Sequence, residues 1–77
     1  MEQWTVNAVA HDKHLRVSYT GGAWACRLSH AIREMCEAND GVEEESGQFT
    51  FLFRFKTAER AHRLATIMNG SQGFRNE

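Results

Sequence analysis

The sequence predicts a two-layer α+β sandwich, in which a three-to-four-stranded, mostly antiparallel sheet carries two helices on one face in the order β-β-α-β-α. Phenylalanine occupies every second position from Phe49 to Phe55, which is the period of a strand with one buried face. Two earlier segments alternate apolar and polar residues, and two others have apolar residues at helical spacing. A chain of 77 residues builds one core. We therefore expect a single domain over residues 1–70 and a flexible tail over residues 71–77.

The first two strands are predicted at residues 4–10 and 15–20, where every second residue is apolar. The polar segment 11–14 between them is short enough for a hairpin, so the two strands should pair antiparallel through a four-residue loop. The side chains expected to face the core are Trp4, Val6, Ala8, Leu15, Val17 and Tyr19.

A first helix is predicted after Gly21-Gly22, which end the second strand. Its apolar residues recur at helical spacing with charged residues between them, which predicts an amphipathic helix. The helix should end at Asn39-Asp40-Gly41, with Gly41 in the left-handed conformation that closes a last turn. The apolar stripe consists of Trp24, Leu28, Ala31, Ile32 and Met35.

The phenylalanine strand is predicted at residues 48–55, with all four phenylalanines facing the core and Thr50, Leu52 and Arg54 facing the other way. The acidic segment 42–46 before it is a candidate short edge strand. A crossover from residues 15–20 through the first helix to the phenylalanine strand should be right-handed and should make those two strands parallel.

A second helix is predicted to begin after Thr57, whose hydroxyl can cap its first turn, and to end at Asn69-Gly70. Its buried stripe consists of Ala58, Ala61, Leu64, Ala65 and Met68. The tail that follows contains one apolar residue, Phe74.

The segment from Gln48 to Gly70 resembles the third strand and second helix of an RNA recognition motif, which implies a ferredoxin-like plait. In that family the strand places aromatic residues on the open sheet face, where they stack on bases. The resemblance aligns Thr50 and Leu52 with those positions, and neither side chain can stack on a base. It therefore implies the fold without implying RNA binding.

Composition argues against several classes of function. A net charge of −1 provides no general attraction to nucleic acid or to an anionic membrane. No apolar run approaches the roughly 20 residues of a membrane span, so we expect a cytoplasmic protein with no membrane contact. Cys26 and Cys36 lie about 15 Å apart if they share one helix, at about 1.5 Å per residue, and should be reduced thiols.

Three short motifs are candidate sites, and each has a simpler interpretation. His11 and His14 have metal-ligand chemistry but occupy a polar turn that supplies no third ligand. Cys26 and His30 are four residues apart and could pair a thiolate with a base, but no orienting carboxylate or oxyanion hole is identifiable, which favours a solvated helix face. Residues 20–22 could offer N–H groups to a phosphate or simply form a tight turn. We expect no enzyme activity, no metal and no cofactor.

Charged residues form two clusters, and these are the predicted partner-binding residues. The acidic cluster is Glu37, Asp40, Glu43, Glu44 and Glu45, and the basic set is Arg16, Arg54, Lys56, Arg60 and Arg63. Segregated charge predicts an electrically two-sided molecule, in which either the acidic side engages a basic groove or the basic side meets an acidic partner. The alternative is that both clusters are solvated surface.

The sequence predicts a non-enzymatic protein-binding module, an inhibitor or modulator of a larger complex that handles nucleic acid. In size and charge the chain resembles small phage-encoded inhibitors such as anti-CRISPR proteins. The alternative is a single-stranded RNA- or DNA-binding domain that uses the basic set on the open sheet face. Both a monomer and a homodimer agree with this length.

Overall fold

The computed structural model describes residues 5–20, 22 and 25–69. Its elements follow the order β-β-α-β-β-α, so the acidic segment is a strand in its own right and adds one element to the predicted order. The elements are β1 (Thr5–His11), β2 (His14–Thr20), α1 (Ala25–Ala38), β3 (Val42–Gly47), β4 (Thr50–Arg54) and α2 (Ala58–Asn69). The predicted core residues Trp4 and Trp24, the glycine at 21, and the tail 71–77 with Phe74 lie outside the described residues.

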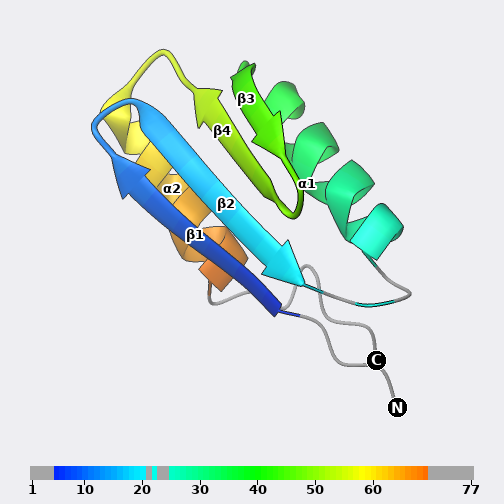
Figure 1. The fold of residues 1–77 in the computed structure, drawn as a ribbon. Helices are drawn as coiled ribbons and strands as arrows, with labels where there is room; N and C mark the ends of the chain where they lie inside the picture. Colours follow the sequence, from blue (N-terminus) through cyan, green and yellow to red (C-terminus); the bar gives the residue numbers. More distant parts are fainter. Residues whose placement is uncertain (1–4, 21, 23–24, 70–77) are drawn as a thin grey trace.

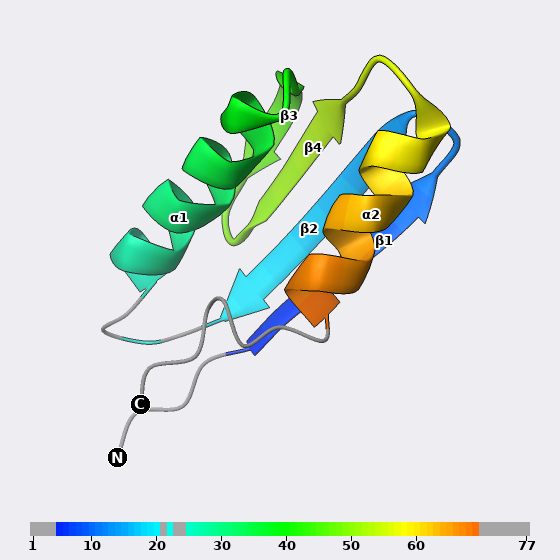
Figure 2. The ribbon, with the colours of Figure 1, turned by 180° about the vertical axis from the view of Figure 1, so that it is seen from behind.

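The four strands form one antiparallel sheet in the order β1-β2-β4-β3, and both helices lie on the same side of it (Figures 1 and 2). Seen from the helix side in Figure 2, α2 covers β1 and β2 whereas α1 runs beside β3 and β4. The opposite face carries no helix in the described part of the chain (Figure 1). The predicted two-layer α+β sandwich is confirmed.

The predicted parallel pairing of β2 with the phenylalanine strand is wrong. The chain leaves β2, passes through α1 and enters β3 at the far edge of the sheet, and β4 then returns between β2 and β3. β3 and β4 form an antiparallel hairpin, and β4 also pairs antiparallel with β2. The strand that runs parallel to β2 is therefore β3, which lies on the other side of β4. The prediction did not include this hairpin, and the hairpin makes β4 run opposite to the predicted direction.

The core lies between the sheet and the helices, and the predicted alternation is confirmed in β2 and β4. Leu15, Val17 and Phe53 are fully buried, and their neighbours Arg16 and Arg54 are exposed on the other face. The buried residues that form this core are Ala8, Leu15, Val17, Tyr19, Leu28, Ile32, Cys36, Phe51, Phe53, Phe55, Ala61, Leu64, Ala65 and Met68. Of the predicted stripes, Leu28 and Ile32 of α1 and Ala61, Leu64, Ala65 and Met68 of α2 are buried, whereas Ala31, Met35 and Ala58 are half-buried, and α1 also buries Cys36.

Phe49 does not join the other three phenylalanines in the core, so the prediction for this residue is wrong. It occupies the turn between β3 and β4 with a φ of 66° and is 44% exposed. Its carbonyl accepts a hydrogen bond from the Tyr19 N–H at 3.0 Å, and the two rings meet edge to face at 5.8 Å. Because the strand begins only at Thr50, the alternation does not extend back to residue 49.

The end of α1 differs from the prediction by one residue. Asp40, not Gly41, has the left-handed backbone, with a φ of 66°. The Gly41 N–H then donates to the Cys36 carbonyl at 2.9 Å, and the Asp40 N–H donates to the Glu37 carbonyl at 3.1 Å, as in a Schellman motif. Gly41 is required for space, because a Cβ there would lie 2.6 Å from the Phe55 ring.

The β1–β2 turn is shorter than predicted, and α2 begins at its predicted cap. His11 pairs with His14, so the β1–β2 connection is a two-residue turn rather than the predicted loop of four, and Asp12 has a φ of 56°. The predicted cap of α2 is confirmed, since the Thr57 hydroxyl accepts a hydrogen bond from the Arg60 N–H at 3.2 Å.

Candidate functional site

A β-bulge in β3 determines where the acidic cluster points. Glu43 pairs with Phe53 and Glu45 pairs with Leu52, which leaves Glu44 as an extra residue between them. An extra residue shifts the alternation, so two consecutive side chains can share one face. Glu44 and Glu45 both contact residues of the helix-free face of the sheet, which we call the open face, whereas Glu43 contacts Arg33 of α1.

On the open face, charges of opposite sign pair across the strands. Glu44 accepts a hydrogen bond from the Arg54 Nε at 2.6 Å and lies 3.0 Å from the His14 Nε2, and Arg16 lies 3.8 Å from Glu45. The hydrogen bond from Arg54 lowers the pKa of the Glu44 carboxyl below its usual value, and contact with His14 acts in the same direction. The open face therefore carries paired rather than segregated charge.

The remaining predicted partner-binding residues are spread over the molecule. Glu43 and Arg33 form an ion pair at 3.1 Å beside α1, where the Arg33 guanidinium also lies over the Phe51 ring. Arg60 binds Asp40 at 2.9 Å and so ties the start of α2 to the end of α1. Glu37 on α1, Lys56 before α2 and Arg63 on α2 are exposed away from the open face. The structure thus brings Glu44, Glu45, Arg16 and Arg54 together on the open face and pairs Asp40 with Arg60 between the helices.

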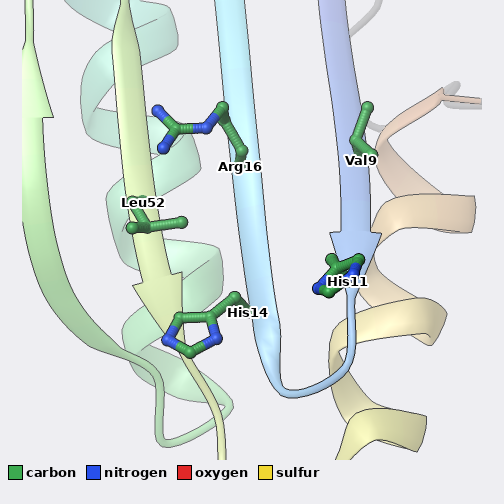
Figure 3. Close-up of a pocket in the computed structure, with 5 residues that line it drawn as sticks. All are labelled: Val9, His11, His14, Arg16 and Leu52. Carbon is green, nitrogen blue, oxygen red and sulfur yellow. The ribbon is translucent and has the colours of Figure 1, made fainter.

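The open face has a hollow of about 380 Å³ near the β1–β2 turn (Figure 3). Register places Val9, Arg16 and Leu52 in one row across β1, β2 and β4, and His11 and His14 side by side in a neighbouring row. Figure 3 shows the Arg16 side chain reaching over β4 and the Leu52 side chain leaning toward β2. Val9 is 58% exposed, so the hollow has an aliphatic surface that water reaches.

Val9 and Leu52 of the hollow belong to neither predicted partner-binding set, and His11 and His14 were considered only as metal ligands, whereas Arg16 belongs to the predicted basic set. Alternation placed Leu52 and Arg16 on the open face, but Val9 was not singled out. His11 and His14 belong to the same surface because the turn holds only two residues. Cross-strand register predicts this grouping, but the register can be derived only when the length of the β1–β2 turn is known.

The other candidate motifs involve the histidines of the β1–β2 turn and the two cysteines. Within the described residues, no three His, Cys, Asp or Glu side chains come together as a metal site. Cys26 is exposed on α1, whereas Cys36 is buried, and burial followed by the nearby Glu37 charge raises the pKa of the Cys36 thiol to about 12. A thiol held neutral in this way is a packing residue rather than a nucleophile.

Comparisons with protein-family models, with curated proteins and with solved structures give no match for this chain. Among the described residues, neither helix is long and apolar enough to cross a membrane. The candidate site is therefore argued from its own residues.

Proposed function

We propose that the protein is a non-enzymatic protein-binding module that docks on a larger partner through the open face of its sheet. The observation that carries the proposal is the pattern of this face: Val9 and Leu52 provide aliphatic surface on either side of Arg16, and ion pairs of Glu44 and Glu45 lie beside them. Protein interfaces combine apolar surface with polar groups, and arginine is enriched in them. The resemblance in size and charge to small phage-encoded inhibitors agrees with action by occupying a partner's surface.

The alternative, binding of single-stranded nucleic acid by the same face, has less support. Stacking on aromatic side chains contributes much of the affinity of such proteins. The aromatic residues of the described strands, Tyr19, Phe51 and Phe53, are buried toward the helices. Arg54 on the open face is already held by Glu44 at 2.6 Å, so it attracts phosphates less strongly.

Affinity capture from nuclease-treated extract of the native cells, read by mass spectrometry, tests the proposal with two matched variants. Val9→Asp places a charge on the open face beside Arg16, and Ile67→Asp places one at an exposed apolar position of α2 on the other layer. We expect a partner retained by wild type and by Ile67→Asp to be lost with Val9→Asp. Equal retention by both variants would contradict docking through the open face, and micromolar binding of mixed single-stranded oligonucleotides at 150 mM salt would favour the alternative.

A further inference from the structure

The hollow on the open face has a lining of one chemical type. Its polar side chains are His11, His14 and Arg16, which are cations or can become cations, and its other side chains are aliphatic. The described residues that line it include no carboxylate. A site of this composition suits a group with an aliphatic stem and a negative end.

The carboxylates that pair with cations of the hollow both belong to β3. Glu44 and Glu45 belong to β3, at the far edge from β1, and they hold His14 and Arg16 from that side. His11, on β1, has no hydrogen-bond or ion-pair partner among the described residues. The hollow therefore retains donors that a ligand can use on the side away from β3.

The Arg16 pair with Glu45 is the one that a ligand can exchange. Its atoms lie 3.8 Å apart, and the two side chains are 53% and 67% exposed. Exposed pairs of this kind contribute little to folding, typically about 0–1 kcal/mol. Arg16 can therefore turn to a new carboxylate at small cost, whereas Arg54 is held at 2.6 Å by Glu44.

We infer that the hollow binds an acidic side chain from a segment of the partner protein, with its methylene groups on Val9 and Leu52 and its carboxylate accepting hydrogen bonds from Arg16 and the two histidines. The inference rests on the proposed function, because it names the chemistry of the partner at that face. A volume of about 380 Å³ lies at the small end of the roughly 300–1,000 Å³ typical of ligand sites, which suits a side chain of a docked segment.

Nuclear magnetic resonance titration of the full chain with two capped hexapeptides tests this inference. One peptide alternates Glu with Gly, and the other replaces each Glu with Gln. We expect the Glu peptide to shift the amide signals of Val9, His11, Arg16 and Leu52 and to bind at least tenfold more tightly than the Gln peptide, with weaker binding at 0.5 M NaCl. Equal binding of both peptides, shifts elsewhere, or no shift at millimolar peptide would overturn the inference.

Matched arginine variants and a small anion complete the experiment. Arg16→Gln should weaken binding of the Glu peptide at least fivefold, and Arg63→Gln on the exposed surface of α2 should leave it unchanged. Free glutamate at the same concentration should bind more weakly than the peptide, and equal binding would show a small-anion site instead of a docking site. If the peptide fails while capture still depends on Val9, the inference falls and the proposed function stands; the reverse result overturns the proposed function alone.

Discussion

The two faces of the sheet are built on different principles, although they use alternate residues of the same strands. On the face toward the helices, Leu15, Val17 and Phe53 are fully buried and are held by volume and shape. On the open face, Arg16 and Arg54 are exposed and are held by ion pairs that the bulge in β3 aligns. One face therefore carries the stability of the domain, and the other can change chemistry with little effect on folding.

The largest expected difference between the faces lies in adjacent residues of β4. Phe53→Ala should lower the free energy of unfolding by about 3–5 kcal/mol, because it leaves a cavity in the centre of the core. Leu52→Ala, one residue away on the open face, should cost about 1 kcal/mol, since a half-buried leucine loses only part of the roughly 1.5–3 kcal/mol of full burial. Urea unfolding followed by circular dichroism measures both.

A marginal domain of this size leaves little folded protein after the larger change. If Phe53→Ala does not populate the native state, Phe53→Leu keeps the comparison measurable, with a smaller loss than alanine and a larger one than Leu52→Ala. Equal unfolding midpoints for the changes at 52 and 53 would mean that the two faces contribute alike.

The core face could be predicted from the sequence because it depends on local periodicity. Phe51 and Phe53 alternate in β4, Phe55 follows its end, and the stripe of α2 recurs at helical spacing behind the Thr57 cap. The prediction for Phe49 was wrong because a residue at a strand end can belong to the turn instead. Its φ of 66° is also unusual for a bulky side chain. Periodicity alone does not locate that boundary.

The open face was much less predictable because it depends on pairing between distant strands. The hollow requires β4 to lie beside β2, and β4 does so only because the acidic segment forms β3 and turns back. The bulge that gives Glu44 and Glu45 a common face has no signal in the composition of the segment. The segregated charge read along the chain therefore becomes paired charge in space.

An intermediate effect is expected at the edge where the helix layer meets β1. The Asn69 side chain, at the end of α2, accepts from the Ala8 N–H at 2.7 Å and donates to the Ala8 carbonyl at 2.6 Å, as a neighbouring strand would. Asn69→Ala should lower the free energy of unfolding by about 1–2 kcal/mol, because two backbone groups lose their partner. Urea unfolding measures this loss.

The same change should leave the edge of β1 open to another chain. Sedimentation velocity over a range of concentrations should then show more self-association for Asn69→Ala than for wild type. Thr66→Ala, which removes a side-chain hydrogen bond within α2 to the His62 carbonyl, is the control and should not change association. Unchanged stability and association in Asn69→Ala would show that the contact between Asn69 and Ala8 neither stabilises the fold nor prevents association through the edge of β1.

The smallest expected effect is on the open face and is visible only through pH. The pKa of Glu44 is lowered in the folded protein, chiefly by the hydrogen bond from Arg54, so the folded state releases this proton at a lower pH than the unfolded chain does. The carboxylate therefore stabilises the fold above its usual pKa of 4.5, and this contribution disappears as pH falls through the lower folded value. Glu44→Gln should have a lower urea midpoint than wild type at pH 7, and the gap between the two midpoints should narrow as the pH falls below 4.5. Glu37→Gln, an exposed change on α1, should show no such narrowing. If the difference in urea midpoint between wild type and Glu44→Gln is the same at pH 7 and pH 3, the open face is not held by ion pairs. The two faces of the sheet would then not differ in the electrostatic way described above.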